Sequence, residues 1–195
     1  MSTSTDLWPG RVLAAFGEPA VVDEGFGPIQ VDVPAEQWAA SVSLARTGLG
    51  CRFFDFLTAV DEGLDGLDHQ QRFRIVCHVA AHRRDGVQHL ILRTLVTDRV
   101  ASVAHVYAGA RWHERETAEM FGVVFTDTEG SPIELEGLLL PEGFEGHPLR
   151  KDFVLASRVA KPWPGAKEPG ESDHDAPARR RTLPPGVPED WGTDA

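Results

Sequence analysis

The sequence contains very few cysteines, and their spacing excludes two kinds of metal site. Only two of its 195 residues are cysteine, Cys51 and Cys77, and they lie far apart without a CxxC or Cys/His ligand pattern. Neither an iron–sulfur cluster nor a structural zinc site can therefore be assembled from this chain alone. Because free cysteine is often buried, we expect two reduced, buried thiols in a cytosolic protein.

Basic residues and long apolar runs are also scarce. Lys and Arg number 19 against 30 Asp and Glu, which gives a formal net charge of -11 and a pI of about 5.1. This balance argues against nucleic-acid binding, since phosphate contacts require a basic face. No apolar run approaches the roughly 20 residues that cross a bilayer, and residues 1–6 lack the features of a signal peptide. We therefore expect any membrane association to come through partners.

The residues that are present predict two helices and two short strands in the first quarter of the chain. Pro9 favours the start of a short helix, and residues 21–22 and 29–33 are typical of short strands. After Pro34 a second helix is expected to lay one face on a sheet. Its apolar residues at helical spacing are Trp38, Val42, Ala45 and Leu49.

The next part of the chain is rich in strand signals. Residues 53–60 predict a central strand, followed by a polar loop over 61–70. Residues 73–79 alternate as in a half-buried strand, residues 83–86 are a hairpin turn signal, and residues 87–96 form the returning strand. Helices followed by hairpin-linked strands predict an α+β fold, a two-layer sandwich of a sheet and packed helices.

Beyond the strands we expect one further helix and then a change of character. Ser102 is the predicted N-cap of this helix and Gly122 its end. We divide the chain into an α+β domain (1–126), an extended interface segment (127–155) and a Pro-rich C-terminal tail (156–195), partly disordered unless bound. In the tail, Trp163 and Trp191 are typical of docking anchors.

Residues 111–153 mix dense charge with large apolar side chains. The stretch opens with Arg-Trp-His-Glu-Arg-Glu at 111–116 and closes with Gly-His-Pro-Leu-Arg-Lys-Asp-Phe at 146–153. Such groups are costly to bury unless paired, so we interpret the stretch as a surface that a partner covers. Arg150 and Lys151, displayed from an extended segment, are suited to clamp carboxylates across an interface, and a solvated basic pair is the alternative.

The same stretch offers weaker signals for chemistry. His113 and Glu116 form an H-x-x-E pair, but the pattern departs from H-E-x-x-H, so hydrogen bonding at a helix surface or interface is favoured over metal binding. Glu114, Glu116 and Glu119 are candidates for paired carboxylates in acid/base work. Without a convergent nucleophile, a solvated or partner-bound face is favoured. A stand-alone acidic adaptor or a small enzyme remains the alternative.

Five motifs in order resemble those of the C-type subunit of NADH:quinone oxidoreductase, the smaller hydrophilic-arm subunit of respiratory complex I. They cover residues 54–61, 102–116, 120–122, 139–142 and 146–153. The resemblance implies an α+β fold with a mixed sheet and an extended C-terminal arm. It also implies a non-catalytic subunit of a proton-translocating complex, which supports electron transfer from NADH to quinone by positioning the quinone-site subunit.

The resemblance further implies that this chain carries no cofactor, and that the iron–sulfur clusters, flavin and quinone belong to partner subunits. The expected partners are the quinone-site subunit, of the D type, and the iron–sulfur subunits of the peripheral arm. The expected location is peripheral, on the cytoplasmic side of the cell membrane. The expected partner-interface residues are Trp112, Glu114, Arg115, Glu116, Met120, Phe121, His147, Arg150, Lys151 and Asp152.

The chain departs from the family pattern at two places. Ala118 and Glu119 stand where the family has an aromatic residue and Asp. In residues 130–137, Glu136 and Gly137 replace an arginine pair, which reverses the local charge. Since interface charges govern partner choice, we expect a compensating change in the neighbour. A related assembly with a different electron donor is therefore an alternative.

Overall fold

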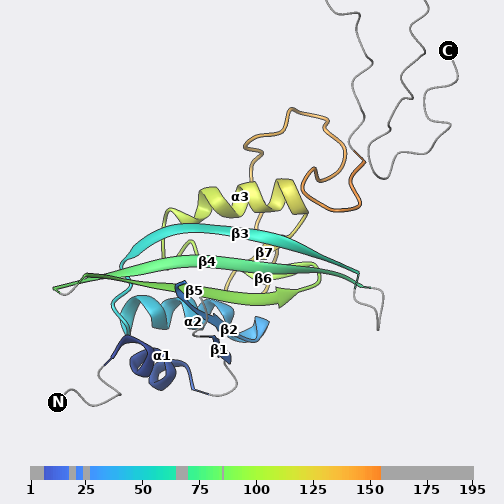
Figure 1. The fold of residues 1–195 in the computed structure, drawn as a ribbon. Helices are drawn as coiled ribbons and strands as arrows, with labels where there is room; N and C mark the ends of the chain where they lie inside the picture. Colours follow the sequence, from blue (N-terminus) through green and yellow to red (C-terminus); the bar gives the residue numbers. More distant parts are fainter. Residues whose placement is uncertain (1–6, 18–20, 24–26, 65–69, 85, 155–195) are drawn as a thin grey trace, which may run out of the picture. The chain divides into compact units, whose positions relative to one another are not determined.

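The computed structural model describes residues 7–17, 21–23, 27–64, 70–84 and 86–154. Within them a five-stranded sheet has the strand order β1-β2-β5-β4-β3, and a second sheet pairs β6 with β7 (Figure 1). The helices are α1 (Trp8–Phe16), the short 3-10 helix η2 (Ala35–Gln37), α2 (Trp38–Thr47) and α3 (Ala110–Phe121). The strands are β1 (Val21–Asp23), β2 (Ile29–Asp32), β3 (Phe53–Leu64), β4 (Gln71–Arg83), β5 (Gly86–Val96), β6 (Arg99–Ala101) and β7 (Val124–Thr126).

The main sheet is mixed, because β2 runs parallel to β5 while the other neighbours are antiparallel. The β4–β5 pair is the hairpin that the sequence predicts, closed by the pairing of Arg83 with Gly86. Helices and sheet form one core, so the predicted α+β fold is confirmed. Among the described residues, no helix is long and apolar enough to span a bilayer.

The core lies against one face of the sheet. Leu57, Cys77 and Leu92 are cross-strand neighbours on β3, β4 and β5, and all three are buried. Side chains directly opposite one another on neighbouring strands share a face, so this row marks the covered side. The predicted face of α2 (Trp38, Val42, Ala45 and Leu49) belongs to the same core, and so does Phe121 of α3.

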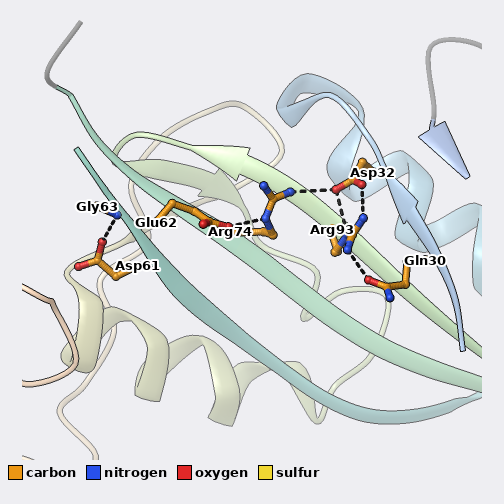
Figure 2. Close-up of polar contacts among 7 residues, drawn as sticks. All are labelled: Gln30, Asp32, Asp61, Glu62, Gly63, Arg74 and Arg93. Carbon is orange, nitrogen blue, oxygen red and sulfur yellow. Dashed lines mark hydrogen bonds and ion pairs between the residues drawn. The ribbon is translucent and has the colours of Figure 1, made fainter. Parts of the chain in front are cut away.

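The opposite face carries a polar network across four strands (Figure 2). Asp32 on β2 pairs with both Arg93 on β5 and Arg74 on β4, and Arg74 Nε lies 2.6 Å from Glu62 Oε1 on β3. Arg93 also donates to Gln30. The Asp32–Arg93 pair joins the two parallel strands directly, because these residues are partners in the β2–β5 register.

Both cysteines are free and fully buried, as predicted. Burial raises the pKa of the Cys51 thiol to about 11 and that of Cys77 to about 12. Thiolate is the reactive form of cysteine, so neither side chain is suited to nucleophilic chemistry at neutral pH.

The prediction that residues 53–60 form a central strand is wrong: β3 lies at the edge of the sheet and extends to Leu64. The aromatic content that suggested a central position has another cause. The Phe54 ring packs 5.4 Å from Tyr107 and 5.3 Å from His113, so it contacts the turn before α3 and α3 itself. An edge strand covered by a helix presents the same sequence signal as a strand between two others.

The predicted start of the third helix is also wrong. Residues 103–107 form turns, in which Val106 and Tyr107 both donate to the Val103 carbonyl, and α3 begins at Ala110. Ser102 does not cap α3; its hydroxyl donates to Glu114 Oε2 at 2.8 Å. The apolar spacing that suggested a longer helix is satisfied by turns that bury Val103 and Tyr107. The predicted end at Gly122 is confirmed.

Residues 127–154 follow β7 with little regular structure. A single bridge joins Thr126 to Pro132, and the remaining described backbone of this segment consists of turns and extended chain. In Figure 1 the segment, drawn in orange, leaves the sheet and returns beside α3. The predicted tail, with Trp163 and Trp191, lies outside the described residues.

We predict that Asp32→Asn lowers the free energy of unfolding by about 1–2 kcal/mol, because Asp32 accepts from two arginines that are only partly screened by water. A urea titration of the full-length chain measures this change. The matched control is Asp98→Asn: Asp98 pairs with its exposed neighbour Arg99, so its loss is expected to cost less than about 0.5 kcal/mol. Equal effects of the two substitutions would contradict a stabilising role for the network.

Candidate partner interface

The C-terminus of α3 is capped by residues that follow much later in the chain. A helix leaves its last carbonyls without intrahelical partners. Here His147 Nδ1 donates to the Glu119 carbonyl at 2.8 Å, the Leu149 amide to Met120 at 3.1 Å, and Arg150 Nε to Phe121 at 2.5 Å. The positive Arg150 also suits the negative end of the helix dipole. The 146–153 motif is thus a helix cap.

Gly122 makes this cap possible. Its backbone is left-handed, with φ 72° and ψ 23°, a conformation that glycine adopts without strain. A Cβ atom at this position would overlap both His147 Nε2 and the Arg150 guanidinium. The guanidinium lies 5.2 Å from the centroid of the Phe73 ring, so it is packed on the core as well as bonded to the helix.

Asp61 ties the returning segment to the end of β3. This carboxylate is 4% exposed and accepts from the Gly63 amide at 2.6 Å, from the Gln71 side chain, and from the Lys151 amide at 2.7 Å. Figure 2 shows its contact with Gly63. The backbone of Lys151 is therefore held in place while the residue itself is exposed.

Two side chains of α3 hold an earlier part of the segment, residues 136–139. Arg115 donates to the carbonyls of Glu136 (2.9 Å) and Gly137 (2.5 Å), and Glu119 accepts from the amides of Leu138 and Leu139, both at 2.7 Å. Burial opposes the ionisation of Glu119, but these amides, that of Leu140 and the Arg115 charge outweigh it and lower its pKa. The carboxylate is thus kept in the form that accepts both bonds.

Glu114 lies inside the protein rather than at a surface. It is 1% exposed, accepts from the Ser102 hydroxyl at 2.8 Å and from the Val103 amide at 2.7 Å, and so fixes the turn that precedes α3. Burial raises its pKa, although the Ser102 hydroxyl and the amides of Val103 and Ala104 favour the carboxylate. The expectation that Glu114 belongs to a solvated or partner-facing surface is therefore wrong.

The ten predicted interface residues fall into three groups. Phe121, like Glu114, is buried, and its ring packs 6.2 Å from that of Phe73. The partly buried ones, which include the cap, are Arg115, Met120, His147 and Arg150. The exposed ones are Trp112, Glu116, Lys151 and Asp152. Only the last group and the outer parts of the second are open to a partner in the described structure.

The two chemical alternatives for this cluster, metal binding and acid/base catalysis, concern His113 and three glutamates of α3. His113 packs its ring against Phe54. Among the described residues, no group of three or more His, Cys, Asp or Glu is arranged to hold a metal ion.

Sequence reasoning missed Asp61, which it placed in a loop. The Asp-x-Gly pattern at 61–63 is the available signal, since an Asp side chain often bonds the backbone two residues on. It considered Glu119 as a departure from the family pattern and as a candidate for acid/base work, whereas in the structure its carboxylate accepts from the backbone amides of Leu138 and Leu139.

The sequence matches known proteins over most of its length, including α3 and residues 127–154. A family model described as the 30 kDa subunit of respiratory-chain NADH dehydrogenase matches residues 31–159. The C-type subunit of NADH-quinone oxidoreductase from Methylobacterium radiotolerans is 36% identical over 151 residues, covering 76% of this chain and 67% of that protein. The same subunit from Bordetella avium is 32% identical over 179 residues, covering 82% of each.

We predict that Gly122→Ala weakens the cap. An alanine at positive φ costs about 1 kcal/mol, and overlap with His147 and Arg150 adds about 1–3 kcal/mol. Gly143→Ala is the matched control, because Gly143 also has positive φ (78°) but nothing lies within 4 Å of its added Cβ. Thermal unfolding of both variants, with amide exchange at Leu149, measures the difference. Indistinguishable variants would contradict the close approach at Gly122.

We predict that Glu114→Gln changes how stability depends on pH. The folded-state pKa of Glu114 lies above its ordinary value of 4.5, so its protonation stabilises the folded chain at acid pH, and this contribution is lost as pH rises through the raised pKa. The variant lacks this titration. In urea titrations, the stability of the variant minus that of the parent should therefore increase as pH rises above about 4.5. A difference that does not change with pH would contradict the inferred burial.

Proposed function

Since the chain belongs to the family of the 30 kDa subunit of respiratory-chain NADH dehydrogenase, it is a subunit of an NADH:quinone oxidoreductase, and we propose that it acts there by positioning the quinone-site subunit. In this proposal the chain is a non-catalytic member of the peripheral arm. The iron–sulfur clusters, flavin and quinone are held by its partners. The complex translocates protons, and this chain reaches the cytoplasmic side of the membrane through those partners.

The observation that carries the proposal is the fixed surface formed by α3 and residues 136–153. Its backbone is held at three places: the cap at Gly122, the Asp61 contact, and the Arg115 and Glu119 bonds. Exposed side chains, among them Trp112 and Lys151, project from this held backbone. A surface ordered in advance loses little entropy when a partner covers it, which suits a subunit that positions another.

The alternative of a small enzyme has less support. Glu114 is the carboxylate of the Glu/His cluster whose pKa is raised, as a general acid would require, yet it is enclosed by Ser102 and the backbone of Val103. A substrate would have to displace these contacts to reach it.

The departure from the family pattern at 130–137 bears on which electron donor feeds the complex. In the departure at 130–137, the carbonyls of Glu136 and Gly137 both accept from Arg115, and the Glu136 side chain is exposed. The reversed charge therefore faces outward, where a neighbour meets it. Identifying the co-purified subunits decides between an NADH-fed complex and one with another donor.

We predict that a tagged chain, extracted from membranes in mild detergent, co-purifies with iron–sulfur and quinone-site subunits. Lys151 gives a sharper readout because it is one of three lysines in the sequence, the others being Lys161 and Lys167. An amine-reactive cross-linker should join Lys151 to the quinone-site subunit. Lys151→Arg keeps the charge and should lose only this link. Recovery of a free monomer from normally respiring cells would contradict the proposal.

A further inference from the structure

Arg115 joins an exposed tryptophan on α3 to the backbone segment that carries an exposed leucine. Its guanidinium lies 5.0 Å from the centroid of the Trp112 ring, and the same group donates to the Gly137 carbonyl, next to the Leu138 and Leu139 amides that Glu119 holds. Trp112 is 61% exposed and Leu139 is 59% exposed. We refer to Trp112, Arg115, Leu138 and Leu139 as the Trp112/Leu139 patch.

The backbone of this patch is fixed although residues 136–139 belong to no helix or strand. Arg115 and Glu119 together bond these four successive residues, two through carbonyls and two through amides. A Cβ atom on Gly137 would lie 3.2 Å from Glu119 Oε1, so the segment is closely applied to the helix. Leu139 therefore projects into solvent from an ordered backbone.

An exposed leucine and tryptophan on an ordered surface have the character of binding anchors. Docking them removes apolar area from water, and the ordering cost of the backbone has already been met within the chain. Tryptophan and arginine are also the residue types enriched where a few contacts carry most of the binding energy. The patch combines both, in contact with each other.

The charges beside the patch indicate the kind of partner. Glu116 lies one turn along α3 from Trp112, and Glu136 supplies one of the carbonyls bonded by Arg115; both residues are exposed. Within the described part of the chain neither carboxylate forms an ion pair. Arginines or lysines on the partner would complement them, whereas the anionic headgroups of a membrane would be repelled.

We propose that the Trp112/Leu139 patch is the docking site for a neighbouring protein subunit that presents an apolar pocket flanked by Arg or Lys. Trp112 and Leu139 enter the pocket, and Arg115 and Glu119 are positioning residues that hold Leu139 in place. This inference rests on the proposed function, since the neighbour is a subunit of the same complex. It differs from the expectation that Arg150 clamps carboxylates across an interface, because the Arg150 guanidinium donates to the Phe121 carbonyl and packs on the Phe73 ring.

The test compares tagged complexes purified from membranes that carry Trp112→Ala, Leu139→Ala or the control Leu13→Ala. Leu13 is similarly exposed, at 49%, but lies in α1. In a salt titration, the quantity measured is the amount of each subunit that stays bound to the tagged chain. We expect each patch variant to retain at least about tenfold less of one subunit than the parent at the same salt concentration, while the control matches the parent. The melting temperature of each isolated full-length chain should stay unchanged, because both side chains are exposed.

The positioning role has its own readout. Glu119→Ala should speed amide exchange at Leu138 and Leu139 and loosen the same subunit as Leu139→Ala. The double variant Glu119→Ala/Leu139→Ala should be no more impaired than the more impaired of the two single variants, because both act through one contact. Additive effects, or unchanged exchange, would overturn the positioning role.

The possible outcomes separate this inference from the proposed function. If the parent chain brings down no complex, the proposed function fails. If the parent assembles and Trp112→Ala and Leu139→Ala assemble equally well, the docking site is elsewhere and only this inference is overturned. Sedimentation of the full-length chain with vesicles of anionic phospholipid, lost in Trp112→Ala, would assign the patch to a membrane and also overturn it.

Discussion

The capped C-terminus of α3 is the constraint on which the arrangement of residues 127–154 depends. Three consecutive carbonyls at the end of the helix accept from His147, Leu149 and Arg150, and Gly122 leaves the space for this approach. The segment has almost no regular structure of its own, so its position comes from contacts with α3 and β3. The proposed partner surface thus depends on donors that satisfy the last carbonyls of a helix.

Three acidic side chains hold the backbone of this surface in place through hydrogen bonds within the chain. Asp61, Glu114 and Glu119 each accept from backbone amides and thereby fix a loop or turn. Conversely, Arg115 and Arg150 donate to carbonyls of the same chain. Several charged side chains in residues 111–153 therefore bond the backbone of the same chain. The exposed surface includes apolar side chains such as Trp112 and Leu139.

The edge position of β3 contributes to this arrangement. Because β3 is the last strand of the sheet, Asp61 near its end is open to the returning segment and can accept from the Lys151 amide. The strand also packs against α3 through the Phe54–His113 contact.

Local patterns in the sequence were sufficient to predict most of the elements and the family. Alternation in β4, the turn at 83–86 and the helical spacing of Trp38, Val42 and Ala45 each depend on neighbours close in the chain. Strand order and the function of each charge depend instead on contacts between distant residues. The folded chain was therefore needed to place β3 at the edge, to bury Glu114 beneath Ser102, and to turn Arg150 onto the end of α3.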